Sequence, residues 1–318
     1  MNSNQVNSHP VNYLEIFDAI DFEKIKDHPN ILIAANFWDE DRYDAAKTCY
    51  KLMRAVDDLV DNYKTEHEVI TEKEQKQLIG HVENWISTIL RFSNEHSEQK
   101  DIVETFGRFS IPTWPMEAFA KSMIYDIHHD GFPTLASFLD YAQGASVAPA
   151  SIFVHLCGLQ KINGQYLLPL YDVKEAAIPC AVFSYLVHII RDFQKDQFNH
   201  LNYFADDLLE KNGLDRKKLS DMAHGATIEK GFRRLIQEYY IVADEYRLKT
   251  YDMIQRIKPY LELRYQLSLE IIFTLYLMVF ERIDIQNGLF TAEELNPTPE
   301  EVRKRVYETI RTFERKNL

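Results

Sequence analysis

Two pairs of aspartates are the residues of this sequence whose types and spacing best suit chemistry. Asp57 and Asp61 stand four positions apart, and Asp192 and Asp196 repeat that spacing. On a helix such residues project from one face, one turn apart, so the two carboxylates of a pair repel each other. They need water or a cation, and hard oxygen ligands suit Mg²⁺ that also binds a phosphate. One pair alone would be better explained as a solvated acidic face, but the repetition favours a metal site.

An arginine accompanies each aspartate pair. Arg54 lies one turn before Asp57, and Arg191 directly precedes Asp192. Guanidinium groups bind phosphates well, so both are candidates to contact a diphosphate, although either would serve equally as a structural partner of the carboxylates. Two facing helices with such pairs would hold Mg²⁺ ions around one diphosphate and neutralise it as its C–O bond breaks. The pattern therefore predicts ionisation of a diphosphate ester.

Long helices are expected to position these residues. The 318 residues are 46% hydrophobic and include only 10 glycines and 11 prolines, a composition that favours helices over strands. No segment alternates convincingly as a strand. Apolar residues recur at helical spacing over residues 43–60, 75–92, 116–127, 135–141, 151–157, 173–193, 232–256, 261–283 and 299–313.

The breaks between these segments predict a single domain. None of the polar stretches is long or biased enough to be a flexible interdomain linker. They lie at 62–73, 93–100, 199–205, 213–231 and 286–298. We therefore predict one all-α domain over residues 1–318, with residues 1–12 disordered. Thr298, Pro299 and Glu301 predict the start of the last helix through a capping box.

Charge and composition exclude several classes of protein. The net charge of −13 argues against a nucleic-acid partner, which needs a basic surface. The cysteines, Cys49, Cys157 and Cys180, form no disulfide or zinc pattern, so a reducing, cytoplasmic compartment is expected. The N-terminus lacks the basic and apolar regions of a secretory signal. The most apolar run, residues 267–280, is too short to span a bilayer and predicts a buried helix.

Several residues could line an apolar cavity. Ala145 and Ser146 are small and would leave room for a long apolar tail, although close helix packing explains them equally well. The rings of Tyr141 and Tyr185 could stabilise a carbocation through their faces, whereas Phe183 is expected in the core.

One histidine-containing cluster has two interpretations. Asp126-Ile-His-His-Asp130 would offer ligands to a transition metal, but its histidines are adjacent rather than one turn apart, so a polar helix end is preferred. No Gly-rich dinucleotide motif, P-loop or His-Glu-x-x-His motif is present.

The order and spacing of the motifs resemble those of the squalene/phytoene synthases, which join two prenyl diphosphates head to head. The resemblance runs through most of the chain and begins with Tyr-x-x-x-Arg-x-x-Asp-Asp-x-x-Asp at residues 50–61. The other matching blocks are 111–112, 122–126, 141–150, 191–196, 203–204 with 207–208, and the apolar helix after 258–259.

The resemblance implies an all-helical fold, a class I isoprenoid (terpenoid) synthase-like bundle with a central cavity between the two aspartate motifs. It implies that one diphosphate ionises with the help of Mg²⁺ and that the double bond of the second substrate attacks the allylic cation. A cyclopropylcarbinyl diphosphate forms, and a second ionisation rearranges it to a linear polyprene.

The resemblance also implies roles for individual residues. Asp57, Asp61, Asp192 and Asp196 would hold Mg²⁺, with Mn²⁺ as an alternative, and Arg54 and Arg191 would contact diphosphate. Tyr141 and Tyr203 would line the reacting centre, while Tyr185, His188, Ala145 and Ser146 would line the cavity.

The chain departs from the family pattern near the second motif. His188 replaces an asparagine one turn before this motif, and Tyr185 replaces a glutamine. Leu201 replaces an arginine and Ala205 a proline after it. These changes affect the expected product and the donor and acceptor roles of the two sites more than the metal chemistry, because all four carboxylates remain.

We therefore expect a transferase that condenses two farnesyl or geranylgeranyl diphosphates to a C30 or C40 product, a carotenoid or hopanoid/sterol precursor. NADPH is expected only if that product is squalene-like. The alternatives are a non-catalytic relative that acts as an assembly or binding factor, and another class I terpene synthase. A cytoplasmic protein, peripheral to the membrane that receives its apolar product, is expected.

Overall fold

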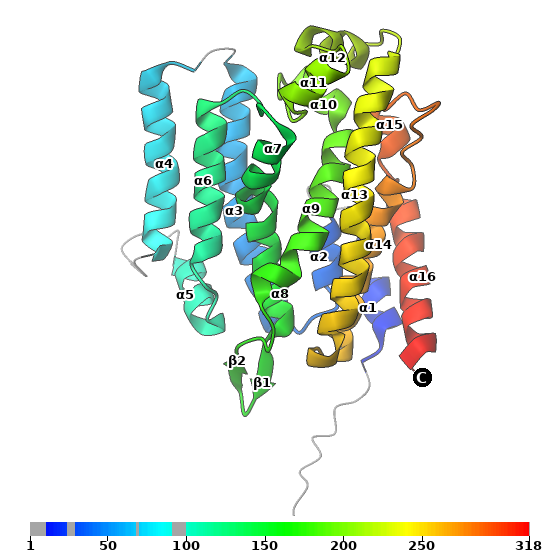
Figure 1. The fold of residues 1–318 in the computed structure, drawn as a ribbon. Coiled ribbons are helices and arrows are strands. Elements are labelled where there is room, and N and C mark those ends of the chain that lie inside the picture. The colour runs from blue at the N-terminus through cyan, green and yellow to red at the C-terminus, as the bar shows by residue number, and fades with distance from the viewer. Residues whose placement is uncertain (1–10, 24–28, 68–69, 91–99, 318) are drawn as a thin grey trace, which may run out of the picture.

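Long helices run side by side along one direction of the molecule, with shorter helices at the two ends of the bundle (Figure 1). The computed structural model describes residues 11–23, 29–67, 70–90 and 100–317. The long helices are α3 (Glu40–Glu66), α4 (Glu72–Leu90), α6 (Trp114–His128), α9 (Val173–Arg191), α13 (Lys230–Ile257), α14 (Leu263–Phe280) and α16 (Pro299–Asn317). The predicted all-α class is confirmed.

The single domain remains a prediction. Of the segment expected to be disordered, residues 1–10 lie outside the described residues, as do residues 91–92 of the predicted helix 75–92.

Capping residues set the helix ends that apolar periodicity could not locate. α3 begins at Glu40, three residues earlier than predicted, because the Asp39 side chain accepts a hydrogen bond of 3.2 Å from the backbone N–H of Arg42. The capping box before α16 is confirmed: the Thr298 N–H donates to the Glu301 carboxylate (2.8 Å), and the Glu301 N–H donates to the Thr298 hydroxyl (3.2 Å).

The helix predicted over residues 173–193 breaks in the middle of the second aspartate motif. α9 ends at Arg191, Asp192 adopts φ −90° and ψ 2°, and α10 (Phe193–Phe198) follows at once. Asp192 and Asp196 therefore do not share one continuous helix, contrary to the prediction. The Asp196 N–H still donates to the Asp192 carbonyl (2.8 Å), so the two residues keep the spacing of one turn.

Two predicted helices, 135–141 and 151–157, are parts of one longer helical stretch. α7 (Leu135–Ala142) continues through the π-helical turn η2 (Gln143–Val147) into α8 (Ala148–Gly158). A π turn inserts an extra residue into the helix and is frequent at functional sites. Here it follows Tyr141 directly, and Gly144 within it lets α6 approach closely: a Cβ at this position would lie 2.1 Å from the Ala118 carbonyl oxygen.

A short antiparallel hairpin contradicts the expectation of no strands. β1 (Gln160–Ile162) pairs with β2 (Gln165–Leu167), and the hairpin projects from one end of the bundle (Figure 1). Asn163 and Gly164, with φ of 51° and 81°, form its two-residue turn. An Asn-Gly pair is a strong hairpin signal, which the search for alternating hydrophobicity missed because the strands are only three residues long.

Apolar periodicity did not predict the short helices. They are α1 (Tyr13–Ala19), α2 (Pro29–Ala35), α5 (Lys100–Phe109), α11 (Asp206–Lys211), α12 (Arg216–Ala223), the 3₁₀ turn η3 (Lys258–Tyr260) and α15 (Ala292–Leu295). Most are too short to show a helical period. The polar breaks predicted at 213–231 and 286–298 contain α12 and α15, respectively.

The most apolar helices lie inside the bundle. α9 and α14 are long and apolar enough to cross a membrane by length and composition, but 61% of each apolar stretch is buried by protein. α9 packs against α8, α13 and α14, and the Phe183 ring contacts Phe273 and Phe280 of α14. The predicted buried helix and the core position of Phe183 are both observed.

Candidate active site

The first aspartate motif lies near one end of α3. Arg54 approaches two carboxylates of this helix, Asp57 at 3.2 Å and Asp58 at 2.6 Å. Burial and the charge of Asp61 together raise the pKa of Asp57 to about 8, against the lowering effect of Arg54. The Asp57 side chain is nevertheless 34% exposed. The carboxylate is therefore partly enclosed by protein but still reached by solvent.

The second motif spans the junction of α9 and α10. Arg191 donates two hydrogen bonds to the Asp192 carboxylate, from Nε to Oδ1 at 2.8 Å and from Nη2 to Oδ2 at 2.6 Å. Asp196 follows one turn later, and burial raises its pKa well above the ordinary value, with the charge of Asp192 adding to the effect. Both arginines thus hold carboxylates, one of the two roles expected for them, and phosphate contact stays a prediction.

The two motifs face each other across the interior. Besides burial and Asp192, the charge of Asp61 on α3 raises the pKa of Asp196 on α10. Burial raises the pKa of Asp61, while Lys64 and, across the site, Lys195 lower it. The effect of Asp61 on Asp196, and that of Lys195 on Asp61, indicate that the charged groups of α3 and α10 are close enough to interact.

A wall of three tyrosines, Tyr141, Tyr185 and Tyr203, lies between the motifs. The Tyr185 ring is 6.2 Å from that of Tyr141 and 6.4 Å from that of Tyr203. Phe132 backs the wall at 4.9 Å from Tyr141 and 6.3 Å from Tyr203. Burial raises the pKa of all three hydroxyl groups well above 10, so the rings stay neutral. Neutral aromatic faces attract positive charge.

Asp126 and Lys64 belong to the site, although neither was among the predicted site residues; Asp126 lies in the matching block 122–126. The Tyr141 hydroxyl donates a short hydrogen bond to the Asp126 carboxylate, and Lys64 Nζ lies 3.9 Å from the same group. Burial raises the pKa of Asp126 to about 7, against the lowering effects of Lys64 and the Tyr141 hydroxyl. The available signal was a lysine three positions after Asp61, matched by Lys195 three positions after Asp192.

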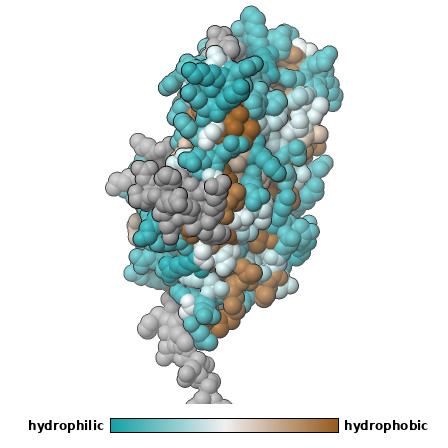
Figure 2. Space-filling view, turned by 90° about the vertical axis from the view of Figure 1, so that its left-hand side faces the viewer, coloured by the Kyte–Doolittle hydropathy of each residue, from teal (hydrophilic) through white to brown (hydrophobic). Residues whose placement is uncertain are grey.

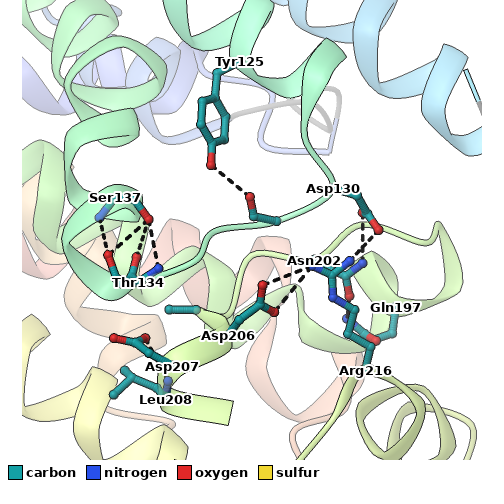
Figure 3. Close-up of polar contacts among 12 residues, drawn as sticks. Tyr125, Asp130, Thr134, Ser137, Gln197, Asn202, Asp206, Asp207, Leu208 and Arg216 are labelled. Atoms are coloured by element: carbon teal, nitrogen blue, oxygen red, sulfur yellow. Dashed lines mark hydrogen bonds and ion pairs between the residues drawn. The ribbon is translucent and has the colours of Figure 1, made fainter. Parts of the chain in front are cut away.

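A polar clamp holds the segment that carries Tyr203. Figure 3 shows Arg216 joined to Asp130 (2.5 Å) and to Asp206 (3.4 Å), and Asn202 donating to Asp130 (3.1 Å). The backbone is linked as well: Phe132 and Ala205 form a parallel bridge, and the Asp206 N–H donates to the Phe132 carbonyl at 2.9 Å. The clamp fixes the segment after α10 against the α6–α7 connection.

The same contacts decide between the two interpretations of the histidine cluster. Asp126 turns inward to Tyr141, and Asp130 turns outward to Arg216. The His129 ring stacks on Tyr125 at 4.0 Å. The cluster is therefore a polar helix end.

The remaining candidates lie along the interior faces of η2 and α9. The Ser146 hydroxyl donates a hydrogen bond to the Ala181 carbonyl of α9 (2.9 Å), so Ser146 supports helix packing. Ala145 is half-buried. The His188 ring lies 5.3 Å from that of Tyr276 on α14. Leu201 is buried, as an arginine at this position would not readily be. Their roles in lining a cavity stay predictions.

The donor set fits Mg²⁺ that is shared with a diphosphate. Within the described part of the chain, no three carboxylate, imidazole or thiol groups come together to enclose an ion. Six carboxylates nevertheless gather around the interior, against four cationic side chains. The carboxylates are Asp57, Asp58, Asp61, Asp126, Asp192 and Asp196, and the cations are Arg54, Lys64, Arg191 and Lys195. When they are ionised, these carboxylates would repel an anionic ligand unless cations are added, and Mg²⁺ commonly binds one or two carboxylates together with substrate phosphates.

Comparisons with known proteins agree on the fold. The chain is similar to the crystal structure of a dehydrosqualene synthase in complex with a ligand, with a TM-score of 0.65 and 14% identity; the match covers 94% of this chain and 98% of that one. It is similar to YisP from Bacillus subtilis, with a TM-score of 0.61 and 13% identity, over 94% of this chain and 100% of that one. It is also similar to the squalene synthase HpnC from Alicyclobacillus acidocaldarius, with a TM-score of 0.55 and 12% identity, over 86% of this chain and 98% of that one.

Sequence comparison identifies the family. No curated protein matches the sequence directly. The model of the squalene/phytoene synthase family matches residues 26–303, which include both aspartate motifs, the tyrosine wall and the polar clamp. Because this match spans most of the chain, the protein belongs to the squalene/phytoene synthase family.

Proposed function

We propose that this protein is a prenyltransferase that joins two prenyl diphosphates of farnesyl or geranylgeranyl length head to head, through a cyclopropylcarbinyl diphosphate, to a C30 or C40 polyprene. The observation that carries the proposal is the arrangement of two carboxylate motifs on α3 and at the α9–α10 junction, facing each other beside a wall of neutral tyrosines.

Asp57, Asp61, Asp192 and Asp196 would hold Mg²⁺. The ion supplies Lewis-acid stabilisation of the diphosphate leaving group. The break after Arg191 suits this role, because it places Asp192 at the junction of α9 and α10 and keeps Asp196 of α10 one turn away from it. Lys64 and Lys195, which lower the pKa of Asp61 from opposite sides, add positive charge at the same place.

The tyrosine wall would stabilise the allylic cation that remains when diphosphate leaves. Tyr141, Tyr185 and Tyr203 present aromatic rings with protonated hydroxyl groups, so they attract the cation without offering a basic oxygen that could capture it. The hydrogen bond from Tyr141 to Asp126 holds the first ring in place. The departures at His188 and Leu201 bear on which product forms and on whether NADPH is used.

The test is to incubate purified protein with farnesyl or geranylgeranyl diphosphate and Mg²⁺, with and without NADPH, and to measure pyrophosphate release and the mass of the extracted lipid. The expected result is release that depends on Mg²⁺ and a condensed C30 or C40 product. No release with either substrate would refute the enzyme proposal and favour a binding factor. Release with only uncondensed or cyclised C15 or C20 products would favour another class I terpene synthase.

A matched pair of variants on α3 tests the metal role. Asp57→Asn should lower turnover by at least about a hundredfold, because it removes a ligand that acts on the leaving group. Asp44→Asn changes an exposed aspartate elsewhere on the same helix and should leave turnover within about twofold. Full activity of Asp57→Asn would rule out the proposed role of this carboxylate.

A further inference from the structure

The β1–β2 hairpin and the segment after it expose apolar side chains at one end of the bundle. Ile162 and Leu167 in the hairpin are 49% and 47% exposed, and Leu168 and Leu170 after it are 60% and 64% exposed. Single exposed leucines are ordinary, but four large apolar residues within nine positions form a patch. We call these four residues the hairpin patch.

The hairpin presents this patch because its other face is anchored to the bundle. Lys161 and Tyr166 form a cross-strand pair, and both side chains bind Asp41 of α3, at 3.2 Å and 3.1 Å. Ile162 and Leu167, each next to one of these residues in its strand, point to the opposite face. The base is fixed too: buried Arg42 donates to the Leu159 carbonyl at 2.7 Å.

Cationic side chains lie on the anchored face of the same hairpin, opposite Ile162 and Leu167. Arg108 of α5 and Lys161 of β1 line a pocket of about 410 Å³, and both are about half exposed. They share the single carboxylate of Asp41, at 2.7 Å and 3.2 Å, so the group keeps a net positive charge. The whole protein carries −13, which makes a local excess of cations on the hairpin that exposes these leucines a specific feature.

The hairpin lies at the end of the bundle away from the aspartates. Asp41, which anchors it, and Asp57 are sixteen residues apart on α3, about 24 Å along a helix. Tyr141 is followed along η2 and α8 by Ala145, Ser146 and finally Leu159, directly before β1. A substrate with its diphosphate at Asp57 and its tail beside Ala145 would point that tail toward the hairpin.

We propose that the hairpin patch docks on an anionic phospholipid bilayer, with the leucines in the acyl boundary on one face of the hairpin and with Arg108 and Lys161 at the headgroup phosphates on the other. Figure 2 shows hydrophobic residues gathered at the lower end of the molecule, the end from which the hairpin projects in Figure 1. Apolar side chains beside cations are the combination that binds anionic lipid surfaces. The link to an apolar product rests on the proposed function, whereas the binding itself does not.

The test is co-sedimentation of the full chain with vesicles of phosphatidylcholine and phosphatidylglycerol, and with vesicles of phosphatidylcholine alone. The protein should bind the anionic vesicles more tightly, and added salt should weaken the binding. The double variant Leu168→Ser/Leu170→Ser should lower the partition coefficient by at least about tenfold. Arg108→Gln/Lys161→Gln should abolish the preference for anionic vesicles.

The control is Leu248→Ser/Leu289→Ser, which removes two leucines that are 52% and 64% exposed elsewhere on the surface. It should bind as the unaltered protein does. An equal loss in both double variants, or no binding by the unaltered protein, would overturn the proposal. A dimer that only the hairpin variant dissociates would do so too, because it would assign the patch to a second copy.

Pyrophosphate release in detergent micelles separates the two proposals. The hairpin variant should keep its turnover there, because no residue of the patch belongs to the aspartate site. Absence of turnover in the unaltered protein would count against the proposed function alone, and the vesicle result would stand.

Discussion

Asp126 lies buried beneath the tyrosine wall, where it accepts the Tyr141 hydrogen bond and lies 3.9 Å from Lys64. A buried carboxylate is costly to ionise unless donors and cations surround it. The Tyr141 hydroxyl and the Lys64 ammonium group only partly offset the burial of Asp126, so the pKa of Asp126 is about 7, well above the ordinary 3.8. The folded protein therefore tolerates the protonated acid better than the carboxylate.

Asp126 should make stability depend on pH. Since its pKa is about 7 in the folded chain and 3.8 when unperturbed, its contribution is fully present below pH 3.8 and is lost as pH rises through 7. Asp126→Asn mimics the protonated acid, so it should gain stability relative to the unaltered protein as pH rises from 5 to 8. Urea unfolding of both proteins at the two pH values measures this difference. An equal pH dependence of the two would contradict the raised pKa.

At the scale of elements, the π turn η2 joins α7 to α8 and brings both against α6 and α9. The Ser122 hydroxyl of α6 donates to the Tyr141 carbonyl (2.8 Å), and Ser146 donates to α9. The absence of a side chain at Gly144 is what allows this contact with α6, since a Cβ would lie 2.2 Å from Ser122 Oγ. Tyr141 is thus positioned by a junction of three helical elements.

Gly144→Ala should destabilise the protein by about 1–3 kcal/mol, because α6 must move to accept a methyl group. Gly80→Ala in α4 and Gly107→Ala in α5 are the controls: no atom lies within 4 Å of the added Cβ, so each should stabilise the protein by about 0.5–1 kcal/mol. Urea unfolding measures all three. A neutral Gly144→Ala would show that the close approach of η2 to α6 is not required.

The polar clamp gives a second prediction at this scale. Arg216→Ala should change the global stability by less than about 1 kcal/mol, because its ion pairs are partly exposed. It should nevertheless speed amide hydrogen exchange at Asp206 and Asp207, whose N–H groups bond the α6–α7 connection. Lys217→Ala removes an ion pair within α12 and should leave that exchange unchanged. Equal effects of the two variants would argue against a clamp.

At the scale of the whole molecule, the site lies between two parts of the bundle, α3 on one side and the α9–α10 junction on the other. Each side carries its own arginine–aspartate pair, and the carboxylates of the two sides repel each other when they are ionised. A ligand that binds α3 and the α9–α10 junction together would link these two parts of the bundle. Such a ligand should therefore stabilise the folded chain as a unit.

Mg²⁺ and pyrophosphate together should raise the midpoint of thermal unfolding, and each alone should raise it much less. The effect should be larger at pH 8 than at pH 6, because Mg²⁺ needs the carboxylate of Asp57, whose pKa is about 8. Differential scanning fluorimetry at both pH values measures the shift, with Asp57→Asn as the variant expected to lose it. An equal shift from pyrophosphate without Mg²⁺ would contradict a shared metal site.

The sequence by itself determined the helical class, the nine long segments of apolar periodicity and the two aspartate pairs, because helical spacing is a local property of the chain. It also determined the family, since the order of motifs is written along the chain. Apolar periodicity did not predict the break after Arg191, the π turn or the hairpin, because single residues or very short elements set the backbone conformation there.

Only the tertiary structure decided what those residues meet. The partnership of Asp126 with Tyr141 and Lys64, the facing of Asp61 and Asp196, and the clamp on the Tyr203 segment all join parts of the chain far apart in sequence. The exposure of the hairpin patch is likewise decided by packing, because the sequence shows leucines but not which of them remain uncovered. Burial and charge proximity arise when helices pack, and they turn two local acidic pairs into one site.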